Sequence, residues 1–337
     1  MRLSILIPMY NAQDFIGNCI ESLLNQNIPK KDYEIIIMDD GSTDNSAEIV
    51  ANYAKSQSNI TLIKDSNSGA YNKRNKLLKL AKGKYIYNLD ADDYIVHNCL
   101  KELLETAEQK DLDIIGFKTK ETKSLTDYEI EQPIDDSKFH FQTGVEFLEN
   151  YPLTRHELWW YFVKRELLST HEFTFNRNQF NADVTFTLNA LLAAGKVGFF
   201  DVTIHRYVQS EDSIMRSKDH EVTKRRLEFM HMMIIDNSQL INKLKVKSPS
   251  EILITNLSHR RDVFTFFNLI KMIRSSLSSD YIKKTVEELK MEKAYPMRHF
   301  NRHRYNTLQY RILRKILNTE SILYLLVSMN RLFSKSA

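Results

Sequence analysis

Short apolar runs alternate with amphipathic segments through the first 120 residues of the chain. The apolar runs predict strands at residues 3–8, 33–39, 60–64, 84–90 and 112–119. Between them, apolar residues recur every three or four positions and predict helices at about 15–24, 43–54 and 71–81. Strands that alternate with helices form parallel sheets. This part therefore predicts an α/β fold with a mostly parallel sheet flanked by helices.

Three helix boundaries carry residues that favour caps. The hydroxyl of Ser42 or Thr43 can cap the second helix, and Thr143 can cap a short helix that runs through Tyr151. Gly83 follows the third helix closely, so we expect it to be the C′ glycine of that helix.

Beyond residue 120 the pattern changes. Residues 121–136 contain six acids and few apolar positions, which predicts a loop. A helix over 181–194, a strand over 196–201 and a polar segment up to Arg216 are expected next. The remaining sequence predicts helices at about 220–243, 249–275, 280–293, 304–317 and 319–333.

Charge divides the chain near residue 220. Residues 1–220 contain 25 Lys and Arg against 33 Asp and Glu, whereas residues 221–337 contain 22 against 10. We therefore expect a catalytic domain over 1–218 and a basic helical extension over 219–337. Its charge predicts an anionic partner, but no nucleic-acid reader motif accompanies it, so we expect an anionic membrane surface. An ordinary bundle with a basic exterior, a region that binds the acceptor, or a homodimer contact is the alternative.

No apolar run is long enough to cross a membrane. The longest, Ile322–Val327, spans six residues against the roughly 20 that a span needs, and the N-terminal run Leu3–Ile7 stops at Pro8. We expect a cytoplasmic protein, peripheral on the inner face of the cell membrane. Cys19 and Cys99 lie among apolar residues at helical spacing, which indicates core packing.

Acidic clusters follow two of the predicted strands. Asp90, Asp92 and Asp93 come at the end of the fourth strand, directly after its apolar run, and Asp39 and Asp40 end the second. Like charges at such spacing repel unless a cation lies between them, and the carboxyl ends of strands are where α/β sheets bind ligands. The sequence therefore predicts a site for a metal and a polar ligand.

Four segments occur in an order and spacing that resemble the family 2 glycosyltransferases. They are Ser4–Asn11, Asp39–Asp44, Asn67–Gly69 with Lys73–Asn75, and Leu89–Asp93. The resemblance covers roughly residues 1–215 and implies the GT-A fold of that family, followed here by the C-terminal helical extension.

The resemblance also implies a nucleotide-sugar donor, most simply a UDP-sugar. It places the ring of Tyr10 against the base and lets Asp40 accept the N3–H of uracil. The alternative for Asn11 is a residue that only forms the turn between strand and helix, and the alternative for Asp39 is a cap of the next helix. Lys73 and Lys76 can equally lie on a solvated face of their helix. The implied donor contacts are Pro8, Tyr10, Asn11, Asp39, Asp40, Asn67, Arg74, Asp90, Ala91 and Arg216.

A divalent cation, Mn²⁺ or Mg²⁺, is implied at the DXD motif formed by residues 90–92. Asp92 is the expected ligand, with Asp90 beside it and His205 as a further candidate. Asp93 is expected either to support the residues that bind the metal or, more plainly, to cap the helix that holds Cys99.

The resemblance implies that Asp183, at the start of a helix, is the catalytic base. Ala182 stands where the family usually has Glu, which departs from the pattern. Glu211 or Asp212 is the fallback base, and the alternative for Asp183 is a helix N-terminal residue stabilised by the dipole. Two aromatic residues that precede the base are expected at the acceptor side or, alternatively, in the core: Trp159 and Trp160.

Together these features predict an inverting, metal-dependent glycosyltransferase that moves a hexose or N-acetylhexosamine from a UDP-sugar to a hydroxyl group. The resemblance implies a glycan acceptor, often lipid-linked, in bacterial capsule, O-antigen or lipooligosaccharide synthesis. The alternative is a catalytically inactive nucleotide-sugar-binding or scaffold protein, which Ala182 favours. A nucleotide-cofactor dehydrogenase is disfavoured because no G-x-G-x-x-G follows the first strand.

Overall fold

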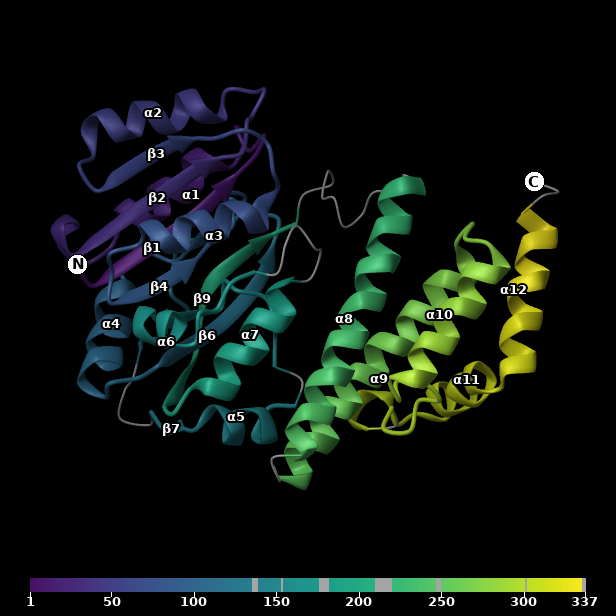
Figure 1. Cartoon of the computed structure of the whole chain (residues 1–337). Helices are drawn as coiled ribbons and strands as arrows, with labels where there is room; N and C mark the ends of the chain where they lie inside the picture. Colours follow the sequence, from purple (N-terminus) through teal and green to yellow (C-terminus); the bar gives the residue numbers. More distant parts are fainter. Residues whose placement is uncertain are drawn as a thin grey trace. The chain divides into compact units, whose positions relative to one another are not determined.

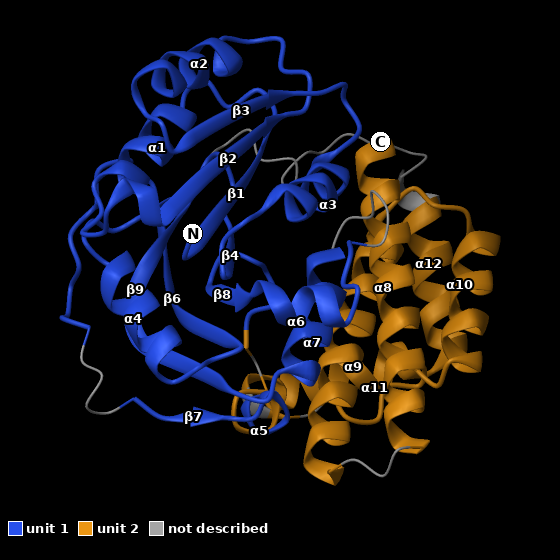
Figure 2. Cartoon of the chain, turned by 60° about the vertical axis from the view of Figure 1, so that its left-hand side comes forward, with its two compact units in different colours: residues 1–147, 155–211 blue, residues 148–154, 212–337 orange. Residues whose placement is uncertain are grey.

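The predicted strands pair into one sheet in the computed structural model of the chain, which describes residues 1–134, 139–152, 154–175, 182–209, 220–246, 250–300 and 302–334 (Figure 1). The chain forms two compact units (Figure 2). The first comprises residues 1–147 and 155–211 and holds the sheet, and the second comprises residues 148–154 and 212–337.

The sheet of the first unit has the strand order β3-β2-β1-β4-β8-β6-β9-β5, with β7 pairing to β9. It is parallel from β3 to β4 and becomes mixed beyond, because β8 runs antiparallel to both of its neighbours. The strands are β1 Leu3–Met9, β2 Tyr33–Asp39, β3 Ile60–Lys64, β4 Tyr85–Asn88, β5 Tyr94–Ile95, β6 Ile114–Thr122, β7 Phe141–Gln142, β8 Tyr161–Lys164 and β9 Val197–Val208.

The five strands expected in the first 120 residues are confirmed. All seven residues of β1 are buried, as expected for a parallel strand covered on both faces. Three short strands, β5, β7 and β8, escaped the sequence pattern because two to four residues are too few for a period. The strand predicted at 196–201 continues through Val208 as β9, so the polar segment expected there begins later.

The helices of the first unit also follow the predicted stripes. Ile16, Cys19, Ile20 and Leu23 of α1 are buried, and Cys99 lies in the same core, so the predicted core role of both thiols is confirmed. The helices are α1 Ile16–Leu24, α2 Ser46–Ser56, α3 Ala70–Leu80, α4 Leu100–Gln109, α6 Arg165–Thr170 and α7 Ala182–Ala193, with a 3₁₀ turn at Lys30–Asp32. Helix α5 Gly144–Asn150 begins in the first unit, and its residues from Leu148 onward belong to the second.

Of the three predicted helix caps, that of α5 is confirmed, whereas those of α2 and α3 are wrong. The first backbone N–H of α2, on Ser46, donates to Oδ1 of Asp44 at 3.0 Å, so neither Ser42 nor Thr43 caps that helix. Thr143 forms the expected cap of α5: its Oγ1 accepts from the Glu146 N–H, while the Glu146 carboxylate accepts from the Thr143 N–H.

Gly83 serves close packing instead of a helix end. Helix α3 ends at Leu80, and the residue that follows it, Ala81, is extended, so no left-handed glycine closes the helix. A Cβ atom at Gly83 would lie 2.4 Å from the backbone nitrogen of Ser4, and the Gly83 N–H donates to Ser4 Oγ at 2.8 Å. Only glycine allows this approach of the chain to β1.

The second unit is helical and has its own core. Helix α9 contributes the largest buried face, and Phe266 of this helix stacks on Phe300 at 4.2 Å between ring centroids. Figure 1 shows α8 and α9 running side by side. The helices of the second unit are α8 His220–Val246, α9 Glu251–Arg274, α10 Ser279–Met291, α11 Leu308–Asn318 and α12 Glu320–Ser334, with a 3₁₀ turn at His303–Tyr305.

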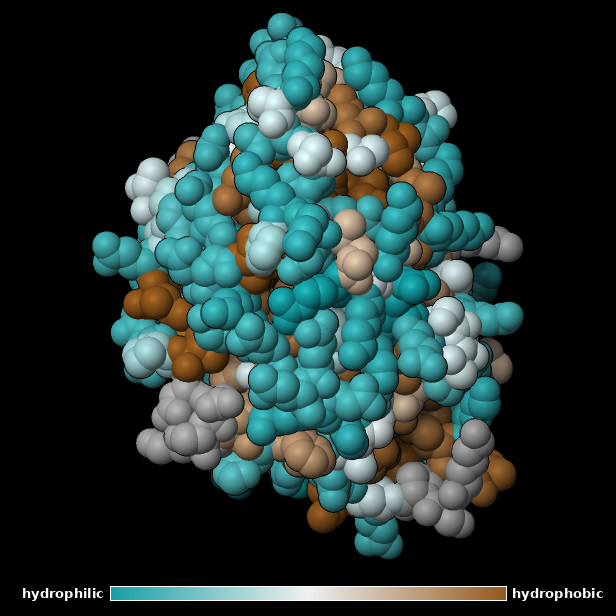
Figure 3. Space-filling view, turned by 90° about the vertical axis from the view of Figure 1, so that its left-hand side faces the viewer, coloured by the Kyte–Doolittle hydropathy of each residue, from teal (hydrophilic) through white to brown (hydrophobic). Residues whose placement is uncertain are grey.

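Hydroxyl side chains cap the N-termini of three of these helices. Ser250, Ser278 and Thr307 each accept a backbone N–H of the first turn of α9, α10 and α11. None of the helices in the described ranges combines the length and the apolar character that crossing a bilayer requires. The face shown in Figure 3 is mostly hydrophilic, with its hydrophobic side chains in separate patches.

Candidate active site

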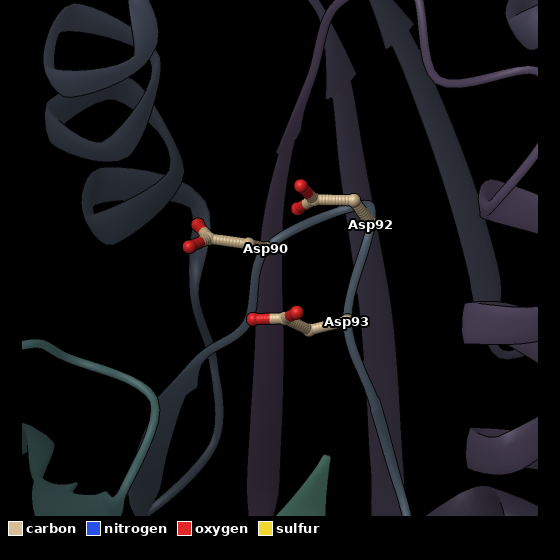
Figure 4. Close-up of side chains that lie close together, drawn as sticks. All are labelled: Asp90, Asp92 and Asp93. Carbon is tan, nitrogen blue, oxygen red and sulfur yellow. The ribbon is translucent and has the colours of Figure 1, made fainter. Parts of the chain in front are cut away.

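Three carboxylates gather on the loop after β4. One oxygen atom each of Asp90, Asp92 and Asp93 lies within 4.8 Å of the others, and the three side chains point in about the same direction in Figure 4. The loop is tight because the Asp93 N–H donates to the Asp90 carbonyl at 3.2 Å, and buried Ala91 anchors it between them. The expected clustering of these acids is therefore realised in the fold.

Burial and mutual repulsion make this cluster costly to ionise. Desolvation, followed by the charges of Asp93 and Asp90, raises the pKa of Asp92 to about 7. Burial also raises the pKa of Asp93 well above its usual range. Clustered carboxylate oxygens are the ligands that hard divalent cations prefer, so the residues present fit Mg²⁺ or Mn²⁺.

Asp93 is wrongly predicted as a helix cap. Helix α4 begins at Leu100, and Asp93 instead accepts the Val208 N–H from the end of β9 at 2.8 Å. Its other oxygen lies 3.2 Å from Nε2 of His205, a fully buried ring whose pKa desolvation lowers to about 3. His205 thus lies behind the cluster, next to Asp93. Direct binding of the metal by His205 stays a prediction.

Arg74 links the acid cluster to helix α3. Its guanidinium forms an ion pair with Asp90 and lies over the Tyr71 ring, 5.4 Å from the centroid. The Tyr71 hydroxyl in turn donates to Oδ1 of Asp183 at 3.1 Å. A continuous series of contacts therefore runs from the proposed metal cluster to the proposed base.

Asp183 lies in the first turn of α7, and its pKa is shifted toward neutral pH. Burial raises its pKa to about 6, an effect that the charge of Arg74 opposes and that of Glu157 reinforces. A carboxylate with a pKa near the working pH suits a general base. Its neighbour Ala182 is buried.

Tyr71 and Glu157 were missed by sequence reasoning. Tyr71 lies one helical turn before Arg74, a spacing that could have suggested contact with the same ligand face. The carbonyl of Glu157 accepts a 3.4 Å hydrogen bond from Thr187 of α7, which places this acid beside the helix of Asp183. No local pattern marks Glu157.

The turn after β1 is bound to the turn after β2. Asn11 adopts a left-handed conformation, with φ of 46°, and its Oδ1 accepts the Thr43 N–H at 2.8 Å. Asp39 accepts both the N–H and the hydroxyl of Ser42. Asn11 and Asp39 therefore hold these turns together. The ring of Tyr10 beside them is 49% exposed and free to lie against a planar ligand.

Asp40 is an anchor for the loop before α3. Its two oxygens accept the N–H groups of Ser68 and Gly69 at 2.7 and 2.8 Å, and Lys73 Nζ lies 2.9 Å from Oδ1. Lys73 is fully buried and also bonds Asp65, so the interpretation of Lys73 as a solvated residue is wrong. Lys76 is exposed, as that interpretation expects.

The other predicted donor residues lie around these turns or outside the described residues. Pro8 is buried within β1, Asn67 is exposed beside Gly41, and Ala91 is buried in the acid loop. Three predicted residues fall in 210–219, which the structure does not describe: Arg216 and the two fallback bases, Glu211 and Asp212.

Both tryptophans are buried. Trp160 stacks on Phe147 and fills the space above Gly116, where a Cβ would approach its ring to 2.5 Å. Trp159 stacks on His205 with 4.5 Å between centroids, directly behind the acid cluster. An acceptor role for either ring stays a prediction, and Trp159 is the one next to the site.

Comparison with known proteins connects this geometry to a family. Residues 4–165 match the family described as Glycosyl transferase family 2. The chain carries a family 2 glycosyltransferase domain. The match includes the turns after β1 and β2, helix α3 and the acid loop, so the resemblance expected from the sequence is confirmed.

Two relatives show how far the likeness extends beyond the family 2 domain. An uncharacterized glycosyltransferase of Bacillus subtilis, EpsJ, is 34% identical over 216 residues, which cover 63% of this chain and 62% of that protein. A poly(ribitol-phosphate) beta-glucosyltransferase of Bacillus spizizenii is 36% identical over 207 residues, which cover 58% of this chain and 30% of that protein. The chain thus spans less than two thirds of either relative.

A solved structure shares the fold over the whole chain. The crystal structure of Staphylococcus aureus TarS 1–349 in complex with UDP-GlcNAc matches with a TM-score of 0.68 and 17% identity, covering 100% of this chain and 92% of that chain. The predicted GT-A fold with a C-terminal helical part is therefore confirmed.

Proposed function

We propose that the chain is an inverting, metal-dependent glycosyltransferase that moves a hexose or N-acetylhexosamine from a UDP-sugar to a hydroxyl group of a lipid-linked bacterial surface glycan. The observation that carries this proposal is the series of contacts from Asp90 through Arg74 and Tyr71 to Asp183. Inverting transfer needs a base on one side of the anomeric carbon and charge stabilisation for the leaving group on the other.

The donor is proposed from the exposed ring of Tyr10 and from the names of similar proteins. TarS is solved with UDP-GlcNAc, and the Bacillus spizizenii relative is a glucosyltransferase by name. Asp40 already accepts two backbone N–H groups and a lysine, but a carboxylate has about four acceptor positions, so uracil N3–H can still be bound.

The metal is proposed at Asp92 and Asp90, with Asp93 and His205 supporting the site from behind. Three carboxylates within reach of one cation support this assignment, as does the strong rise in the pKa of Asp92 without one. Such a cation, when bound, offsets the negative charge that develops on the departing diphosphate.

In the proposed reaction, Asp183 accepts the proton of the acceptor hydroxyl group. The hydroxyl oxygen bonds to the anomeric carbon from the face opposite the diphosphate, and the bond from that carbon to the diphosphate oxygen breaks. Both electrons of the broken bond leave with UDP. Tyr71 holds Asp183 in place and keeps its carboxylate hydrogen-bonded before the proton arrives.

The acceptor class is proposed from the relatives as well. Poly(ribitol-phosphate), named for the Bacillus spizizenii relative, offers hydroxyl groups along a cell-surface polymer. Capsule, O-antigen and lipooligosaccharide acceptors offer the same group and are usually built on a lipid.

A catalytically inactive protein that only binds the nucleotide sugar is the second candidate. Ala182, at the position where the family resemblance places Glu, favours it. Glu157 argues for activity, because its charge acts on Asp183 from a neighbouring segment and can take over the electrostatic role of the missing acid.

Donor screening separates the two candidates. The full chain with Mn²⁺ is incubated with UDP-glucose, UDP-galactose and their N-acetyl forms, and UDP release is measured against the Asp183→Asn variant. The proposal expects UDP release from one donor with the wild type and a large loss in the variant. Binding of a UDP-sugar with equal, negligible release from both proteins, in the presence of ribitol-phosphate and lipid-linked acceptors, would favour the inactive candidate.

A further inference from the structure

The segment around α11 carries positive charge without any acid. Residues 293–319 contain seven Lys and Arg and no Asp or Glu. Five of the seven cations are exposed: Lys293, Arg298, Arg304, Arg311 and Lys315. Because this segment contains no carboxylate side chain that could offset its charge, it attracts anions over roughly one Debye length, about 8 Å at physiological salt.

The exposed side of α11 is apolar as well as cationic. Leu308 and Ile312, one helical turn apart, are 70% and 50% exposed. At 100° per residue, Arg311 and Lys315 fall on the same side within about 100° of arc. The opposite side packs inward through buried Leu317, so α11 is held on the second unit by one side while the other remains uncovered among the described residues.

Helix α12, which packs against α11, adds a second exposed apolar stripe. Ile322, Leu325 and Met329 recur at intervals of three and four residues, so they share one side of the helix. They are 39%, 57% and 43% exposed. Two adjoining helices thus both present large apolar side chains outward, one of them together with cations.

We propose that α11, with α12 beside it, binds the surface of an anionic phospholipid membrane. Arg311 and Lys315 lie where they can contact lipid phosphates, and Leu308 and Ile312 where they can enter the acyl boundary. A second copy of this chain would present the same cations and repel, and nucleic acid would leave the leucine and isoleucine exposed to water. Of these three partners, lipid alone satisfies both the charge and the apolar residues.

Vesicle flotation of the full chain tests this proposal. The chain is expected to float with vesicles of phosphatidylcholine plus phosphatidylglycerol but not with phosphatidylcholine alone. Raising the ionic strength from about 0.1 M to about 1 M shortens the Debye length from about 10 Å to about 3 Å, so it is expected to release most of the bound protein.

Two pairs of variants identify the surface. Arg311→Glu with Lys315→Glu, and separately Leu308→Ser with Ile312→Ser, are each expected to lower the vesicle partition coefficient by at least about tenfold. The matched controls are Lys283→Glu with Lys284→Glu on exposed positions of α10, and Met291→Ser at a side chain that is 74% exposed. Circular dichroism confirms that every variant is folded.

Three outcomes would overturn the proposal. One is equal flotation with neutral and anionic vesicles, and another is an equal loss in the α10 controls. The third is absence of vesicle binding together with a dimer in analytical ultracentrifugation that Leu308→Ser with Ile312→Ser converts to a monomer. That result would make the surface a contact between copies. None of these measurements requires a sugar donor, so their failure is distinguishable from failure of the proposed transfer activity.

Discussion

The hydroxyl of Tyr71 donates a 3.1 Å hydrogen bond to Asp183, 112 residues further along the chain. The same tyrosine ring supports Arg74, which forms an ion pair with Asp90 of the acid cluster. Helix α3 therefore carries, within one turn, the residues that connect both ends of the candidate active site.

Asp183→Asn is expected to lower the rate of transfer about 10²- to 10⁴-fold, because the amide cannot take the acceptor proton. Binding of UDP and metal should change little, since Asp183 does not belong to the acid cluster. Transfer rates and UDP titrations of the purified variant check this. Full transfer activity would assign the base to another residue.

Transfer is expected to fall as the pH drops through about 6. Asp183 must be ionised to act as a base, and burial raises its pKa to about 6 from the ordinary value near 4. Protonation therefore begins at a higher pH than for an exposed aspartate, and activity is retained above that pH. The measurement is kcat/KM against pH. A profile that stays flat down to pH about 4 would contradict the assignment.

Tyr71→Phe and Glu157→Gln are expected to move the acidic limb of that profile in opposite directions. The Tyr71 hydrogen bond lowers the pKa of Asp183, so its loss shifts the limb to higher pH. The Glu157 charge raises this pKa, so its removal shifts the limb to lower pH. The control Tyr53→Phe removes a similar tyrosine–carboxylate bond, to Glu21, and should leave the profile unchanged. Shifts in the same direction would disprove this account.

Asp92→Asn is expected to abolish the stabilisation that Mn²⁺ adds in the presence of UDP. Loss of one anionic ligand weakens the cluster, and the neutral amide cannot replace its charge. Differential scanning fluorimetry with UDP, with and without Mn²⁺, measures the change in Tm. Asp201→Asn, at a side chain that is 80% exposed, is the control. If the Asp92→Asn variant kept the metal-dependent shift in Tm, the metal site would have to be assigned to other residues.

Gly83→Ala is expected to destabilise the fold by about 1–3 kcal/mol, because the added methyl would lie 2.4 Å from the Ser4 nitrogen. Gly17→Ala in α1 is the matched opposite: no atom lies within 4 Å of its Cβ position, and alanine should stabilise the helix by about 0.5–1 kcal/mol. Urea unfolding of both variants measures the free energy of unfolding. Equal effects would contradict the packing role of Gly83.

The parts of the site that the sequence could predict are those fixed by a single strand and its end. Asp90 and Asp92 come together because the buried strand β4 stops at Asn88, two residues before Asp90. Asp93 could not be assigned in the same way, since its partners Val208 and His205 lie on β9 and depend on how that strand pairs.

Helix α3 illustrates the same limit. Its apolar spacing predicts the helix, but Lys73 and Tyr71 have side chains that can lie in solvent as well as in a core. Their burial and bonding depend on Asp40 and Asp183, which reach them only when the sheet has formed. Partners so distant in the sequence produce no local pattern of apolar and polar residues from which they could be predicted.

The buried lysine of α3 also constrains how relatives of this chain can diverge. Lys73 has its charge neutralised by Asp40 and Asp65, and Asp40 in turn fixes the Ser68–Gly69 turn. A lineage that loses the aspartate at position 40 would leave the buried cation with Asp65 as the remaining one of its two carboxylate partners until position 73 also changes. Substitutions at positions 40, 65 and 73 should therefore be inherited together, which makes their covariation in an alignment an independent record of this contact.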